Sequence, residues 1–61
     1  MKGSELKRLL KKNKCFITDH RSNHDEWYSP KTRNHFFVPR HDSQEVDTGT
    51  LRSILKAAGI K

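Results

Sequence analysis

The stretch CFITDHRSNHDEWYSPKTRNHFFVP, residues 15–39, decides the fold of this chain. It contains three short runs rich in β-branched and aromatic residues, at about 15–19, 24–29 and 35–38. The polar turns HRSN and PKTRN separate these runs, and a proline follows each of the last two. Two hairpins in succession predict a three-stranded antiparallel meander.

A helical pattern precedes this stretch. Ser4 is suited to cap it, and leucines recur at helical spacing between basic residues in the segment that follows. The sequence therefore predicts a first helix over about residues 5–13, ended by Asn13 or Lys14.

A second helical pattern lies near the C-terminus. Thr48 or Thr50 is suited to cap this helix, and Gly59 is placed to end it, with Ile60 in contact with Leu55. The apolar positions of the helix fall on one stripe, at Leu51, Ile54, Leu55 and Ala58.

The predicted order is α-β-β-β-α, an α+β fold with both helices on one face of the antiparallel sheet, because each helix has a single apolar stripe. Strand alternation then sorts the side chains by face. Those expected to face the helices are Trp27, Phe36 and Val38. Those expected on the open face are His24, His35, Tyr28 and Phe37. Asp25 then faces inward, and the only explanation that the pattern offers is that Asp25 lies close enough to the turn to reach water.

Length and charge narrow the possible functions. A chain of 61 residues makes one domain, residues 1–61, with a thin core and no deep pocket, so that any site is a shallow patch suited to a polymer. The net charge is +6, and residues 1–14 hold six basic residues against one acidic residue. This local positive field favours a polyanion or an acidic partner over a merely solvated helix face.

Other features of the sequence exclude several classes of site and of protein. A single cysteine, Cys15, rules out an internal disulfide and a thiolate-built zinc site, and its apolar neighbours favour a buried side chain. No apolar stretch is long enough for a membrane span or a signal peptide, so we expect a cytoplasmic protein with no membrane partner.

Metal and nucleophile chemistry fit the residues poorly. His20 and His24 have H-x-x-x-H spacing, but the intervening residues read as a turn rather than a helix. Asp25 and Glu26 are adjacent on a strand and point to opposite faces, which does not suit a two-metal site. No serine lies in a strained elbow. We therefore expect no metal and no cofactor.

Metal-free acid/base chemistry remains. Histidine both takes and gives a proton near neutral pH, and on RNA it can deprotonate a ribose 2′-OH that attacks the adjacent phosphate. His24 would transfer the proton, Tyr28 or Phe37 would stack a base, and lysine or arginine would hold the phosphate. The alternative is a surface histidine on a hairpin.

Four segments together resemble the HicA toxins, small mRNA interferases of bacterial and archaeal toxin–antitoxin pairs. They are SELKRLLKKN near the start, SNH at 22–24, VPRH at 38–41 and GTLRSILKAAGI at 49–60. The resemblance covers nearly the whole chain, in order and at the expected spacing. It implies a fold like a double-stranded-RNA-binding domain, metal-free cleavage of mRNA, and a HicB-type antitoxin that blocks the site.

The resemblance also implies site residues. The essential histidine of the family follows a G-S or G-S-N segment, and only His24 matches it. The glycine is absent here, and we expect Asn23 to adopt the left-handed conformation in its place. His41 and Arg40 of VPRH are candidates for supporting roles, as a second acid/base group and a phosphate contact. Candidate RNA contacts on the first helix are Lys7, Lys11 and Lys14, whose charge also suits an acidic antitoxin.

Two other readings stay open. One is a non-catalytic RNA-binding module of the same fold, in which His24 is a bystander. The other is a degenerate toxin kept for its interaction with the antitoxin, for which the missing glycine and Asp25 are the only support.

Overall fold

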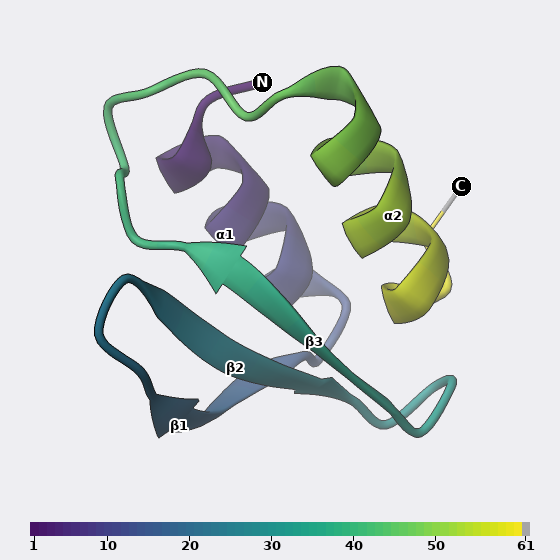
Figure 1. The fold of residues 1–61 in the computed structure, drawn as a ribbon. Coiled ribbons are helices and arrows are strands. Elements are labelled where there is room, and N and C mark those ends of the chain that lie inside the picture. The colour runs from purple at the N-terminus through teal and green to yellow at the C-terminus, as the bar shows by residue number, and fades with distance from the viewer. Residues whose placement is uncertain (61) are drawn as a thin grey trace.

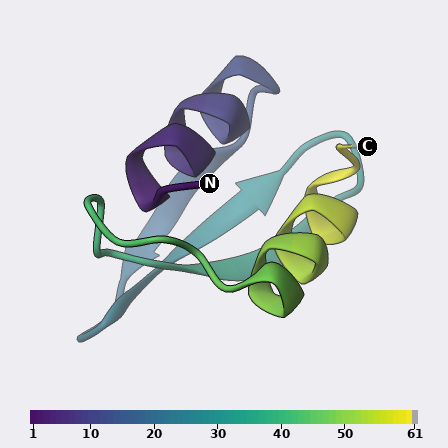
Figure 2. The ribbon, with the colours of Figure 1, turned by 90° about the horizontal axis from the view of Figure 1, so that it is seen from above.

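The central strand of the sheet is β2, His24–Ser29. It pairs antiparallel with β1, Phe16–His20, on one side and with β3, Asn34–Pro39, on the other. The helices are α1, Gly3–Lys12, and α2, Thr48–Ala58. Both helices lie on the same face of the sheet, as Figure 1 and the view from above in Figure 2 show. The predicted α-β-β-β-α fold is confirmed.

The computed structural model describes residues 1–60. Its extents are 26 × 25 × 19 Å, so every side chain of the described part is close to a surface. Within this part, no helix is long and apolar enough to cross a membrane.

Side chains alternate across the sheet as predicted. Toward the helices, the strands bury Asp25, Trp27, Ser29, Phe36 and Val38. On the open face, the strands leave exposed or half-buried His24, Glu26, Tyr28, His35 and Phe37. Because each residue of β2 lies opposite one residue of β3 without a bulge, the two outward rows stay in register.

Trp27 lies at the centre of the core and is fully buried. The other core side chains come from α1, β3, α2 and the residue just before β1: Leu6, Leu10, Phe36, Val38, Ile54, Ala58 and Cys15. Cys15 is therefore a buried thiol, as expected, and β1 begins one residue after it. β1 contributes no buried side chain because it is an edge strand with a bulge between Ile17 and Asp19.

The end of α2 is as predicted, whereas its beginning is not. Gly59 has φ +76° and Ile60 donates its N–H to the Leu55 carbonyl at 2.9 Å, which is the expected Schellman ending. The N-cap is Asp47 rather than Thr48 or Thr50. The Asp47 carboxylate accepts from the Thr50 N–H at 3.0 Å and lies 3.1 Å from its hydroxyl.

The predicted Ser4 cap of α1 is wrong, because the helix begins earlier, at Gly3, with Lys2 at the N-cap. The loop between β3 and α2 passes beside this end of α1 (Figure 1). Backbone carbonyls of that loop, at Gln44 and Asp42, accept the N–H groups of Gly3 and Ser4 at 3.0 Å each. The free N–H groups of the first turn are thus hydrogen-bonded to a distant segment, and no local capping pattern in the sequence predicts this.

Gly3 permits this close approach. A Cβ at this position would lie 2.5 Å from the His41 carbonyl oxygen, which is backbone and cannot rotate away. We expect Gly3→Ala to lower the free energy of unfolding by roughly 1–3 kcal/mol, the usual cost of overpacking. Urea denaturation would measure it. The control is Gly49→Ala in α2, where the nearest atom is an Asp47 carboxylate oxygen at 3.4 Å, and where the variant should be neutral or slightly more stable.

Candidate functional site

His24 is the first residue of β2 and follows directly on the turn of the β1–β2 hairpin. The Arg21 amide donates to the His24 carbonyl at 2.8 Å and closes the hairpin. Neither Ser22 nor Asn23, between them, has a positive φ. The expectation that Asn23 adopts a left-handed conformation is therefore wrong, and the absence of a glycine imposes no strain on this turn.

The His24 side chain is exposed on the open face of the sheet. Together with Arg21 and Phe37 it lines a shallow depression of about 520 Å³. The Phe37 side chain, from β3, is 54% exposed, so one ring face is available for stacking. An imidazole, a guanidinium and an aromatic ring therefore meet at one surface depression.

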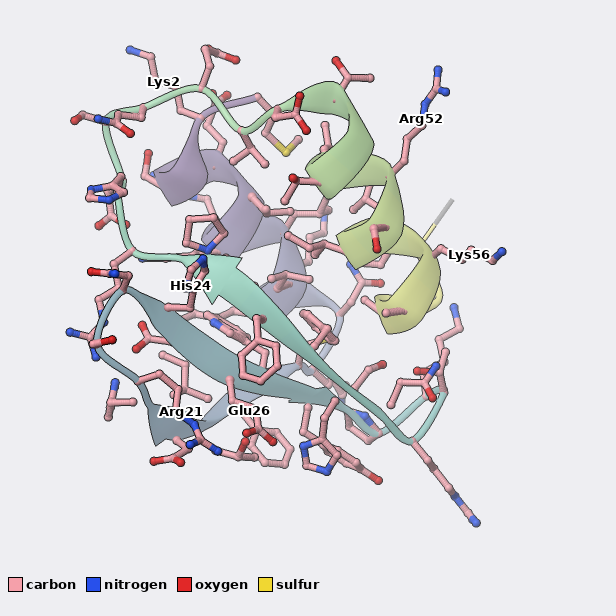
Figure 3. All side chains as sticks on the ribbon, viewed as in Figure 1. Lys2, Arg21, His24, Glu26, Arg52 and Lys56 are labelled. Atoms are coloured by element: carbon pink, nitrogen blue, oxygen red, sulfur yellow. The ribbon has the colours of Figure 1, made fainter. Side chains whose placement is uncertain are left out.

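Arg21 was not among the predicted site residues, and its charge is partly engaged. Its Nε lies 3.2 Å from Oδ2 of Asp19, and one terminal nitrogen lies 3.6 Å from Oε1 of Glu26. Figure 3 shows the Arg21 and Glu26 side chains directed toward one another on the open face. A bound phosphate would therefore compete with two carboxylates for this guanidinium.

The far end of the open face carries an aromatic row. The ring of Tyr28 lies 5.5 Å from the ring of Phe16 and 4.8 Å from that of His35, with tilted planes in both pairs. His35 also places Nδ1 at 2.9 Å from Oε2 of Glu26. Of the two predicted stacking residues, Phe37 is thus beside His24, whereas Tyr28 is packed between two other rings.

On the helix side of the same sheet end, Asp25 is 5% exposed. Its Oδ1 accepts from Nε of Arg40 at 2.9 Å and lies 2.8 Å from Nδ1 of His20. Burial opposes the ionisation of Asp25, but the hydrogen bonds from His20 and Arg40 outweigh it and hold its pKa below the usual range. These two partners explain the inward carboxylate, and they point it away from His24.

This geometry can be set beside known proteins. A family model described as "HicA toxin of bacterial toxin-antitoxin" matches residues 3–60. The chain belongs to the HicA toxin family. No curated protein and no solved structure matches it.

In this HicA toxin, the predicted RNA contacts do not share one surface. Lys11, on α1, and Lys14, in the turn after α1, are exposed, whereas His24, Tyr28 and Phe37 lie on the open face. Lys7 is engaged elsewhere, because its Nζ contacts the Arg40 carbonyl at 3.3 Å and forms an ion pair with Asp42. Lys7 thus ties α1 to the loop after β3.

The toxin's His41, the predicted second acid/base candidate, lies in that loop. It lines a different pocket, together with Pro39 before the loop, Glu45 within it and Thr50 after it. The structure therefore brings His41 toward the start of α2, and it groups Arg21 and Phe37 with His24 instead. Arg40 is closer to the hairpin, through its contact with Asp25.

The described residues of this toxin contain no group of three or more His, Cys, Asp or Glu side chains that could hold a metal ion. His20 and His24 are on adjacent strands rather than on one helix face. In the register, His20 faces Asp25, one residue after His24, so the two imidazoles project from opposite faces of the sheet.

Proposed function

We propose that this HicA toxin is a metal-independent endoribonuclease that cleaves single-stranded mRNA, with His24 as an acid/base group. The observation that carries this proposal is the depression shared by His24, Arg21 and Phe37. It combines a group that can move a proton, a cation for phosphate and a platform for a base, which are the parts that such cleavage needs.

In the proposed reaction, neutral His24 takes the proton of a ribose 2′-OH. The 2′-oxygen then attacks the adjacent phosphorus, and the P–O5′ bond breaks as O5′ takes a proton from solvent water, to give a 2′,3′-cyclic phosphate and a 5′-hydroxyl. Arg21 offsets the negative charge that develops on the non-bridging oxygens, and Phe37 holds a neighbouring base in place. Exposed Lys11 and Lys14 raise the local RNA concentration through their positive field.

We further propose that a HicB-type antitoxin neutralises the toxin by covering the open face. Phe37, Phe16 and His24 are exposed together on this face, so that a partner could bury apolar surface and occlude the site in one contact. The net charge of +6 favours an acidic partner surface.

The test of this function is incubation of the purified toxin with a defined single-stranded mRNA in EDTA, followed by chemical mapping of the new ends. Cleavage that leaves 2′,3′-cyclic phosphates and 5′-hydroxyls, and that stops when a HicB-type antitoxin is added, supports the proposal. Cleavage only after addition of a divalent metal would contradict it.

One observation favours the second reading, a non-catalytic RNA-binding module. No described residue forms a hydrogen bond with the His24 ring, whereas catalytic histidines are commonly oriented by a partner. Under that reading the toxin binds RNA without turnover, and the same incubation would leave the mRNA intact.

The carboxylate of Glu26 gives a further prediction. Glu26→Gln removes a negative charge beside Arg21 and frees its guanidinium for phosphate, so RNA affinity should rise by up to about fivefold at low salt. Fluorescence anisotropy with a labelled RNA would measure it. Glu5→Gln on α1 is the control, because it makes the same charge change far from His24 and glutamine also suits its capping position. Equal gains in both variants would show that only the net charge matters.

A further inference from the structure

The aromatic row at the far end of the open face contains one ring from each strand. Phe16 lies opposite Tyr28, and Tyr28 lies opposite His35, so the three side chains leave the sheet on the same side. The two outer rings are open to solvent, since Phe16 is 50% exposed and the His35 side chain is 54% exposed. Neither outer ring belongs to the core, and the proposed cleavage chemistry uses none of the three.

Contacts on the open face hold these rings in place. The half-buried Tyr28 ring lies between the other two, with centroids 5.5 Å from Phe16 and 4.8 Å from His35. Nδ1 of His35 is also 2.9 Å from Oε2 of Glu26. A ring that is already fixed loses little side-chain freedom when a ligand binds, which suits an exposed ring for stacking a base.

The row is the next surface along the sheet beyond Phe37. His35 precedes Phe37 by two residues on β3, and Tyr28 follows Glu26, the partner of Phe37, by two residues on β2. Two residues of a strand span about 7 Å, which is twice the ~3.4 Å between stacked bases of a nucleic-acid helix. Bases on Phe37 and on the row would thus be unstacked from each other, as the bases of a single strand can be.

An RNA strand bound at the His24 depression has to leave it over neighbouring surface. In one direction along β2 lies the hairpin turn, and in the other, beyond Phe37, lies the aromatic row. Arg33, in the turn just beyond the row, is exposed and forms no ion pair with any described residue. A stacking surface with a free cation beside it matches the base and the phosphate of a nucleotide.

We propose that the aromatic row is a second nucleotide subsite of this toxin, in which Phe16 or His35 stacks a base and Arg33 contacts the phosphate. The inference rests on the proposed ribonuclease function. It makes the preferred substrate an extended single strand along β2, longer than the dinucleotide that flanks the cleaved bond. The row adds affinity rather than chemistry, because Tyr28 is four residues from His24 on β2, about 13 Å away.

The experiment measures the binding of 2′-O-methyl RNA oligonucleotides, which this toxin cannot cleave because the attacking 2′-oxygen is blocked. Competition against a labelled strand, followed by fluorescence anisotropy, gives the affinity of each length from a dinucleotide upward. Binding to the unaltered toxin should tighten as the strand is lengthened. Phe16→Leu and His35→Leu should each weaken the binding of the longer strands by roughly 5–100-fold, the usual effect of losing one stacked base, and leave the dinucleotide unchanged.

Three further variants separate stacking from other effects. Phe16→Tyr and His35→Phe keep a ring and should retain most of the affinity for the longer strands. Ile17→Ala is the matched control on the same edge strand. Ile17 is 36% exposed, but it lies opposite Trp27 and therefore faces the helix side, so its removal should leave the affinity unchanged.

Single-turnover cleavage of ordinary RNA in EDTA gives a second readout. Phe16→Leu should raise the toxin concentration needed for half the maximal rate and leave the maximal rate unchanged. If Phe16→Leu and His35→Leu bind long strands as tightly as the unaltered toxin does, the second subsite is wrong and the ribonuclease function stands. The same holds if they lose affinity only for a HicB-type antitoxin, which would assign the row to the protein partner. No cleavage by the unaltered toxin would instead overturn the proposed function.

Discussion

His24→Ala is expected to lower the rate of RNA cleavage by roughly 10²–10⁴-fold, the range for loss of a proton-transfer residue. The affinity for RNA should change little, because Arg21 and Phe37, which line the same depression, remain to contact phosphate and base. The free energy of unfolding should stay within about 0.5 kcal/mol, since the His24 side chain is exposed on the open face.

Single-turnover cleavage of a labelled mRNA in EDTA, with toxin in excess, separates the chemical step from binding. Phe37→Ala is the comparison variant, because it touches the same depression without a titratable group. We expect Phe37→Ala to weaken RNA binding by about 1–3 kcal/mol, the usual contribution of one base stacked on an aromatic ring. Its effect on the cleavage rate at saturation should be smaller. If His24→Ala cleaves as fast as the unaltered toxin, the proton transfer takes place elsewhere.

Local patterns in the sequence were sufficient for the fold. The alternation along β2 identified the buried Trp27 and the exposed His24 correctly, because period-2 alternation depends only on neighbouring residues. Gly59 predicted the end of α2 correctly, because this signal is also local. α1 ends in the same Schellman geometry, with the Cys15 N–H bonded to the Leu10 carbonyl at 3.0 Å, but with Lys14 at φ +67°, a residue that gives no such signal.

The contacts that the sequence did not predict depend on the exact closure of a turn or on the pairing of separate strands. Arg21 lies beside His24 because the hairpin closes across two residues, and an explicit two-residue turn in the pattern would have indicated this pairing. The grouping of His20 and Arg40 around Asp25 depends on the register of three strands and on the path of the loop after β3. No periodicity within a single segment contains that information. The roles of the predicted site residues remain proposals that the variants above test.

Asp25→Asn is expected to lower the free energy of unfolding at pH 7 by roughly 1–3 kcal/mol. The substitution keeps the volume but removes the charge that accepts from both Arg40 and His20, and it leaves a buried polar group with poorer partners. A domain of this size has only about 3–9 kcal/mol of stability in total, so the loss is a large share. Urea denaturation followed by tryptophan fluorescence reports it, since Trp27 is fully buried.

The pH dependence of this stability difference shows whether it comes from the charge of Asp25. The pKa of Asp25 is lowered in the folded state, so its stabilising contribution is complete above the unfolded value of about 3.9 and is lost as the pH falls through the lower folded value. The unaltered toxin should therefore lose stability on acidification below about pH 4. The difference in free energy of unfolding between the unaltered toxin and Asp25→Asn should narrow there. Asp19→Asn, an exposed carboxylate on the same hairpin, should cost less than about 0.5 kcal/mol at any pH. If the difference in free energy of unfolding stays constant down to pH 2, the loss of stability comes from packing rather than from charge. The charge of the buried carboxylate would then not be what orients His20.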